Sequence, residues 1–147
     1  MADGHKTPSE LVDYMIKTGI DKATKPLFKL ILLGIFGGAF IALGGAGNII
    51  SGSTLVKTDP GLAKFVGACV FPVGLIMVVI LGSELFTSNC LLSVAYTNKK
   101  ITFIQLIRNI ITVYLFNYVG SFIVSYITVK GGSFNSDSLA YLQDIAT

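Results

Sequence analysis

The sequence predicts an all-α membrane protein with three spans, and two observations support this fold class. Hydrophobic residues make up 52% of the 147 residues and charged residues only 13%, which is too little charge for the surface of a soluble domain. The uncharged stretches 30–56 and 109–129 each exceed the roughly 20 residues that a membrane helix needs. Two shorter uncharged stretches, 65–83 and 85–98, make one further span if Glu84 lies within it.

The composition also excludes several kinds of protein. The net charge is only +3, and the lysines lie beside the spans instead of forming a basic patch, so no nucleic-acid partner is expected. Cys69 and Cys90 lie in apolar sequence without other ligands at metal-binding spacing, and we interpret both as packing residues. No arrangement of a nucleophile with a base is visible, so we predict neither an enzyme nor a bound cofactor.

Residues 1–26 are predicted to form a cytoplasmic N-terminus with an amphipathic helix. Thr7, Pro8 and Glu10 make a capping-box pattern that starts the helix, and the next proline ends it at Lys25. Apolar residues recur at helical spacing opposite the charged ones. This pattern favours a helix that lies along the lipid headgroups, with packing against cytoplasmic loops as the alternative. No cleavable signal is visible, so the uncut first span is expected to direct insertion.

Residues 27–130 hold the three predicted spans. The first, 27–50, carries a stripe of small residues four apart, which favours close packing of helices in lipid over lining a pore: Gly34, Gly38, Ala42 and Ala46. The third, 101–129, carries polar groups that are expected to bond to neighbouring helices: Asn109, Thr112, Asn117 and Ser121. Residues 131–147 are predicted to form an extracytoplasmic loop followed by a short helix at 136–146.

The second span, from about residue 64 to residue 98, contains the most informative stretch. Its middle carries a carboxylate, hydroxyls and an amide within apolar sequence. Polar or non-helical backbone at membrane depth is tolerated only where it is buried in protein or lines a water-filled path, and an ionisable group there costs about 2.5 to 3.5 kcal/mol on insertion scales. We therefore predict a helix broken at 82–90, at a site where something polar binds or passes.

The basic residues near the ends of the spans predict the orientation. One side collects Lys17, Lys22, Lys25, Lys29, Lys99 and Lys100, and the other has Lys57, Lys64 and Lys130. We expect a multi-pass protein of the inner (plasma) membrane with a cytoplasmic N-terminus.

The broken helix favours an anion as the polar species. Freed backbone N–H groups and the positive end of a half-helix that restarts near Cys90 could replace part of an anion's water shell, and Thr87 and Ser88 would add hydroxyl donors. Four apolar residues beside this site predict narrow constrictions that favour small, easily dehydrated anions: Phe71, Leu75, Leu85 and Phe86.

Two polar residues of the break are predicted to stabilise it instead of binding the anion. We expect the Glu84 carboxylate to accept hydrogen bonds from loop amides, and Asn89 to stabilise the same loop. A proton relay through Glu84 is the alternative, since an ionisable group inside a membrane often marks such a relay.

Several motifs together resemble the formate/nitrite transporter family, which includes hydrosulfide channels. They are the glycine-rich first span, the segment 71–74 (Phe-Pro-Val-Gly), the segment 82–88 (Gly-Ser-Glu-Leu-Phe-Thr-Ser) and the segment 117–120 (Asn-Tyr-Val-Gly). The resemblance implies an aquaporin-like bundle of two inverted repeats, a homopentamer with one pore per protomer, and passage of formate, nitrite or hydrosulfide. By position, Leu85, Phe86 and Thr87 match the family's loop, and Phe71 and Leu75 match its constriction.

The sequence also departs from that family. Family members have a second repeat, a central pore histidine and a lysine at the start of that repeat, whereas the only histidine here is His5 in the polar N-terminus. We expect the chain to be the first repeat, with the second repeat of the same protein as its partner. The alternatives are a neutral-solute channel, weakened because no Asn-Pro-Ala occurs, and a non-transporting membrane anchor subunit, for which no pair of haem-ligating histidines is present.

Overall fold

The computed structural model describes residues 7–146, and all regular structure in that part of the chain is α-helical. His5 lies outside the described residues. Helices in chain order are α1 (Pro8–Ala23), α2 (Leu27–Leu55), α3 (Pro60–Val70), α4 (Pro72–Ile80), α5 (Phe86–Asn89), α6 (Leu92–Thr97), α7 (Phe103–Lys130) and α8 (Ser136–Ala146). The predicted all-α membrane class is confirmed, because three helical segments are long and apolar enough to cross a membrane: α2, the α3–α4 pair and α7.

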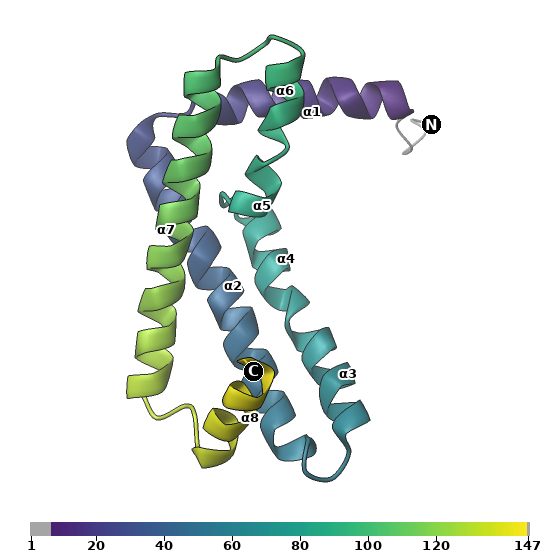
Figure 1. Cartoon of the computed structure of the whole chain (residues 1–147), viewed down its shortest axis with the longest axis vertical. Coiled ribbons are helices and arrows are strands. Elements are labelled where there is room, and N and C mark those ends of the chain that lie inside the picture. The colour runs from purple at the N-terminus through teal and green to yellow at the C-terminus, as the bar shows by residue number, and fades with distance from the viewer. Residues whose placement is uncertain (1–6, 147) are drawn as a thin grey trace.

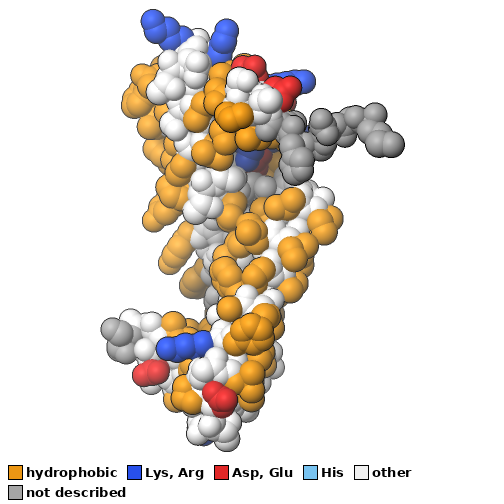
Figure 2. Space-filling view, turned by 90° about the vertical axis from the view of Figure 1, so that its right-hand side faces the viewer, with side chains coloured by type: hydrophobic (Ala, Val, Ile, Leu, Met, Phe, Trp, Pro, Cys, Tyr) orange, Lys and Arg blue, Asp and Glu red, His pale blue; other side chains and the backbone are white. Residues whose placement is uncertain are grey.

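The three span-length segments run along the long axis of the molecule, and α1 lies across one end of them (Figure 1). The turn between α6 and α7 lies at the same end as α1, whereas the turn between α2 and α3 and the helix α8 lie at the opposite end. Hydrophobic side chains cover most of the length of the molecule, and most charged side chains lie near its two ends (Figure 2). This distribution suits a molecule whose middle is in lipid.

Helix α1 begins as its capping box predicts. The Thr7 backbone N–H donates to Glu10 Oε2 at 2.7 Å, and the Thr7 hydroxyl accepts from the Glu10 N–H. The helix ends at Ala23, two residues before the predicted end. Its last turns pack on α6 through a small buried cluster of Ala23, Leu92, Ala95, Ile101 and Leu106, which fixes α1 across the ends of the spans.

Helices α2 and α7 pack closely because glycines stand at their contacts. A Cβ added to Gly38 would overlap the backbone oxygen of Asn117, and one added to Gly120 would overlap the backbone oxygen of Ile35. Half of the predicted stripe therefore serves close packing, as Gly34 also lies against α7. The other half, Ala42 and Ala46, instead lines a hollow of about 310 Å³ between α2 and α7.

The second span bends once and then breaks. It bends at Phe71, where α3 ends, since Pro72 cannot donate a backbone hydrogen bond to continue the helix. It breaks after Ile80, and the chain becomes helical again at Phe86. The break is shorter than the predicted 82–90, because the helix already restarts at Phe86 as α5. Cys90 and Leu91 then form a second turn, and α6 begins at Leu92, near the predicted restart.

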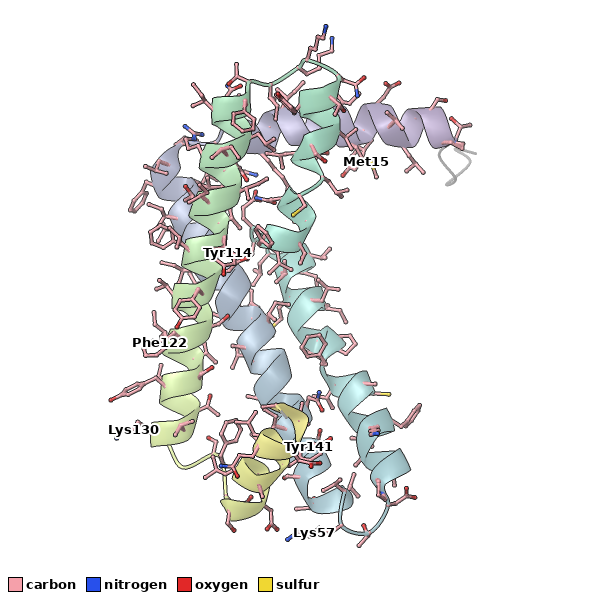
Figure 3. The ribbon with its side chains drawn as sticks, viewed as in Figure 1. Met15, Lys57, Tyr114, Phe122, Lys130 and Tyr141 are labelled. Carbon is pink, nitrogen blue, oxygen red and sulfur yellow. The ribbon has the colours of Figure 1, made fainter. Side chains whose placement is uncertain are left out.

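The remaining segments are tied to the far end of α2. Ser138 of α8 shares a buried hydroxyl hydrogen bond of 3.1 Å with Ser53, and Tyr141 packs over Gly52. Lys57 and Asp137 form an exposed ion pair across the same contact. Tyr141 and Lys57 thus lie near one another at this end, away from Met15 on α1 (Figure 3). The predicted packing role of Cys69 and Cys90 is wrong within this chain, because both residues are exposed.

Candidate functional site

The break in the second span rests on α2. The Ser83 N–H donates to Val78 O at 3.0 Å and closes the end of α4, while the Glu84 N–H donates to Leu33 O of α2 at 3.1 Å. Gly37 permits this approach, because a Cβ there would overlap the backbone oxygen of Glu84. The loop is thus held against a neighbouring helix by its own backbone.

The side chain of Asn117, on α7, holds the same loop from the other side. Its Nδ2 donates to Glu84 O at 2.9 Å and to Gly34 O at 2.7 Å, and its Oδ1 accepts from the Phe86 N–H at 2.8 Å. One amide therefore joins α2, α7 and both ends of the turn between Glu84 and α5. In lipid, where no water competes, such bonds replace the helical hydrogen bonds that the break removes.

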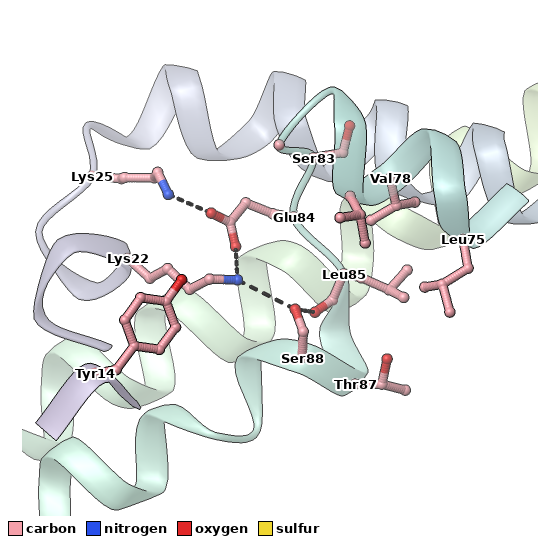
Figure 4. A pocket seen from close by; sticks show the side chains of 12 residues that line it. Tyr14, Lys22, Lys25, Leu75, Val78, Ser83, Glu84, Leu85, Thr87 and Ser88 are labelled. Carbon is pink, nitrogen blue, oxygen red and sulfur yellow. Dashed lines mark hydrogen bonds and ion pairs between the residues drawn. The ribbon is translucent and has the colours of Figure 1, made fainter. Parts of the chain in front are cut away.

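The Glu84 carboxylate is only 1% exposed and pairs with two lysines of the α1 end. Lys22 Nζ lies 2.9 Å from Oε2 and Lys25 Nζ lies 2.5 Å from Oε1 (Figure 4). The donors are thus the ammonium groups of Lys22, in α1, and Lys25, in the linker after α1, and not the loop amides that the sequence analysis expected. A buried carboxylate is tolerated when it is paired and hydrogen-bonded in this way.

A chain of amides extends this network to α7. Lys22 Nζ also donates to Asn89 Oδ1 at 2.7 Å and to the Ser88 hydroxyl at 3.2 Å. Asn89 Nδ2 donates to Asn109 Oδ1 at 2.7 Å, and Asn109 Nδ2 donates to the backbone oxygen of Lys22 at 2.9 Å. The buried side chains of Asn89 and Asn109 thus connect α1, α5 and α7 in a closed set of hydrogen bonds.

Three hollows follow one another from the α1 end, past the broken span, to the space beside α2 and α7, and we call them together the central groove. The first, about 610 Å³, is lined by Lys22, Lys25 and Glu84 among others (Figure 4). The second, about 500 Å³, shares Leu75, Leu85 and Thr87 with the first. The third is the hollow beside Ala42 and Ala46, and it shares Ile41 and Ser121 with the second.

All six predicted pathway residues lie in this groove. Ser88 lines the first hollow, Phe71 and Phe86 line the second, and the three shared residues Leu75, Leu85 and Thr87 stand between the two. The Phe86 ring also packs edge-on against Tyr114, with ring centroids 5.2 Å apart. The placement brings the apolar and hydroxyl residues together, although it does not by itself assign a role to any of them.

The backbone around Thr87 keeps unused donors. Among the described residues, the N–H groups of Thr87 and Ser88 have no hydrogen-bond acceptor, as is usual in the first turn of a helix. The Thr87 side chain is exposed, whereas the Ser88 hydroxyl donates to Leu85 O at 2.9 Å. Thr87 lines both hollows, and no hydrogen bond engages its hydroxyl among the described residues. The single hydroxyl hydrogen of Ser88 is already donated within the loop.

Sequence reasoning missed the partners of the loop. Lys22 and Lys25 were counted only toward orientation. Asn109 and Asn117 were interpreted as groups that bond neighbouring helices, and Asn117 also as part of the 117–120 motif, but neither was assigned to the loop. The spacing of the lysines carried a usable signal. Lys22 and Lys25 lie three residues apart at the end of an amphipathic helix, and a carboxylate such as Glu84 inside a membrane span needs cationic partners.

The fold and this site define an all-α membrane protein in which polar groups converge on an interruption of the second span. A family profile described as "Formate/nitrite transporter" matches residues 9–147. The chain belongs to the formate/nitrite transporter family, as its resemblance in sequence predicted.

Relatives of this chain are named as formate channels. The "Formate channel FocA" of Haemophilus influenzae is 43% identical over 142 residues, covering 96% of this chain and 50% of the relative. The "Formate channel BtFdhC" of Bacillus thuringiensis is 38% identical, covering 83% and 47% respectively. The "Formate channel FocA" of Escherichia coli K12 is 38% identical, covering 78% and 40%. The chain thus spans about half the length of the curated relatives that it matches.

Proposed function

We propose that this chain supplies one half of a membrane channel or transporter for small monovalent anions, with formate as the first candidate and nitrite and hydrosulfide as the others. The observation that carries the proposal is the position of Thr87. Thr87 lines both the first and the second hollow of the central groove, one residue after the broken span becomes helical again at Phe86. Family membership and the names of the relatives support the same class of function.

The chemistry around Thr87 suits a small anion. The Thr87 hydroxyl and the N–H groups of Thr87 and Ser88 can all donate hydrogen bonds to an anion. Together they could replace part of its hydration shell. The walls on either side are apolar, with Phe71, Leu75 and Leu85 among them, so a large hydration shell would not be replaced. A monovalent anion of few atoms loses the least on entering such a site.

The charges of the first hollow favour an anion as well. Lys22 and Lys25 carry two positive charges, and Glu84 cancels one of them, so this buried cluster keeps a formal charge of +1. The lysine side chains are 17% and 23% exposed, which leaves them reachable from the hollow. One monovalent anion would balance the cluster, and a fixed charge beside a low-dielectric wall concentrates such an ion locally.

The remaining organisation follows from the same proposal. Residues 1–26 would lie on the cytoplasmic face of the inner (plasma) membrane, 27–130 would form the three-span repeat, and 131–147 would lead outside. The open central groove would be closed by a second repeat of the same protein, and five protomers would assemble. The end of the molecule that carries α1 also carries most of the lysines, which supports an inside location for it.

Flux through the full-length protein in liposomes tests the proposal. Formate, nitrite and hydrosulfide uptake would be followed as pH varies, with water and glycerol as neutral solutes. Thr87→Val should lower anion flux by about 10- to 100-fold, since a hydrogen bond to a charged species contributes about 1.5–3 kcal/mol. Thr54→Val, at an exposed position near the end of α2, is the matched control and should leave flux unchanged. Water or glycerol flux without anion flux would contradict the proposal, and no flux of any kind would favour a membrane anchor.

A further inference from the structure

We propose that Asn117 is a positioning residue for the proposed anion site: it sets the direction in which Thr87 points. The inference rests on the proposed function for the identity of the permeant anion. It does not rest on that function for the placement of Thr87, which can be measured separately. Asn117 was not among the residues that the sequence analysis assigned to the pathway.

The geometry uses the whole amide. The side chain of Asn has two N–H donors and one carbonyl acceptor; both donors bond to backbone oxygens, of Gly34 and Glu84, and the acceptor takes the Phe86 N–H. These partners also determine which way the amide is turned. Turned over, its oxygen would face two carbonyl oxygens and its NH₂ would face an N–H group.

The two loop bonds act on either side of the residue that links them. Asn117 holds the carbonyl of Glu84, at the end of the break, and the amide of Phe86, the first residue of α5. Leu85 between them has extended backbone, with φ −120° and ψ 133°. Asn117 therefore fixes the start of α5, next to Thr87, whereas Lys22 and Asn109 hold the end of α5 through Ser88 and Asn89. Thr87 is the residue of α5 whose direction follows most directly from the two Asn117 bonds.

The opposite side of the turn is closed by α2. Gly37 lies so near the Glu84 carbonyl that an added Cβ would overlap it, so the loop cannot move toward α2. The third bond of Asn117, to Gly34 O on α2, ties the clamp to the same helix. The loop is thus held between the backbone of α2 at Gly37 and the side chain of Asn117. Of these two contacts, only the one with Asn117 can be removed by changing a side chain.

Ser121 provides a matched control one helical turn further along α7. Its hydroxyl donates to Gly38 O of α2 at 3.0 Å, in the same manner as Asn117 donates to Gly34 O. It makes no hydrogen bond to the loop among the described residues. Ser121→Ala therefore removes a comparable tie between α2 and α7 and leaves the position of α5 alone. Because Ser121 itself lines the second and third hollows, it serves as a control for labelling at position 87 and not for flux.

A double-variant cycle tests the proposal by flux. Asn117→Leu keeps the approximate shape and adds no charge, and it should lower formate flux about tenfold while the protein elutes from size exclusion like the wild type. In combination with Thr87→Val, Asn117→Leu should lower flux no more than twofold below the weaker-conducting single variant. The reason is that both substitutions disable the same donor, the Thr87 hydroxyl. Losses that multiply would overturn the proposal, since Asn117 would then act independently of Thr87.

A second measurement does not require transport. In the full-length protein with Cys69→Ala and Cys90→Ala, Thr87→Cys is labelled in liposomes by a small negatively charged methanethiosulfonate. Adding Asn117→Leu should slow labelling at least threefold, whereas adding Ser121→Ala should change it less than twofold. Equal effects of the two would overturn the inference. If the wild type carries no anion but the labelling differs as expected, the proposed function fails and the positioning role stands.

The folding of the variants is also informative. If Asn117→Leu does not assemble, Asn117→Ser takes its place, because serine keeps a hydroxyl but is too short to reach both sides of the turn. If neither variant assembles, Asn117 is a framework residue and the proposal is wrong.

Discussion

The pairing of α2 with α7 and the broken span beside it are held by opposite means. Between α2 and α7, glycines such as Gly38 and Gly120 let backbone touch backbone, and dispersion over a long contact holds the pair. Around the break, side chains from α1, from the linker that follows it and from α7 bond a short stretch of backbone and one carboxylate. The first arrangement depends on the absence of side chains, and the second depends on a few particular ones.

This difference predicts how the two regions respond to substitution. In the α2–α7 contact any added atom should be harmful, whatever its chemistry. At the break, volume matters less than whether donors and acceptors still match. Substitutions that separate volume from chemistry can therefore test the contrast.

The largest expected effect is that of Gly38→Ala. The new Cβ would overlap the backbone oxygen of Asn117, and neither helix can yield without separating along its length. Overpacking typically costs about 1–3 kcal/mol, and a contact with backbone on both sides should reach or exceed the upper value. The yield of monodisperse protein in detergent and its thermal midpoint measure the effect. Gly45→Ala is the control, because nothing lies within 4 Å of the added atom. An equal yield and thermal midpoint of the two variants would show that close backbone contact at Gly38 does not limit the packing of α2 on α7.

Glu84→Gln should have an intermediate effect. The change keeps the size of the side chain but leaves Lys22 and Lys25 facing a neutral group. Breaking a fully buried ion pair costs roughly 3–5 kcal/mol, and less is expected here because both lysines are partly exposed. A fall in the thermal midpoint of the detergent-solubilised full-length protein would measure the loss.

The same variant separates the two roles considered for Glu84. If the carboxylate only holds the loop, stability falls and any remaining flux keeps the wild-type dependence on pH. Intact assembly with an altered pH dependence of flux would instead indicate a proton relay, and the purely structural account would be wrong.

The smallest expected effect is that of Lys57→Gln at the far end of the molecule. This lysine also forms an ion pair, with Asp137, but the two side chains are 62% and 36% exposed. Exposed pairs contribute about 0–1 kcal/mol, so the thermal midpoint should scarcely change. A loss as large as that of Glu84→Gln would mean that burial does not decide the strength of these pairs.

The sequence predicted those features that depend on neighbours along the chain. The capping box at Thr7 and the bend at Pro72 follow from local rules. The existence of a break near Glu84 follows because apolar sequence makes a buried charge conspicuous. A restart near Cys90 was expected and α6 does begin at Leu92. The earlier restart at Phe86 was not expected, since nothing in the local sequence shows that the Phe86 N–H finds an acceptor on Asn117.

What could not be predicted was which distant groups meet. Glu84 lies about 60 positions from its lysines, and the contacts of the α1 end with α6 and α7 bring them together. The exposure of Cys69 and Cys90 has a related cause: in lipid, apolar sequence does not tell a face that packs on protein from a face that is free. The length and hydrophobicity of a segment identify a span, whereas the residues that its side chains contact are decided by the assembled fold.

Gly82, at the start of the break, differs from every glycine in the α2–α7 contact. Its φ is +62°, and no atom lies within 4 Å of the place where a Cβ would stand. A methyl group would have ample room there, yet an L-residue other than glycine costs about 1 kcal/mol or more in the left-handed backbone region. Replacing it with a D-alanine by chemical synthesis should therefore be harmless where L-alanine is not, which makes handedness, and not bulk, the property required at this corner.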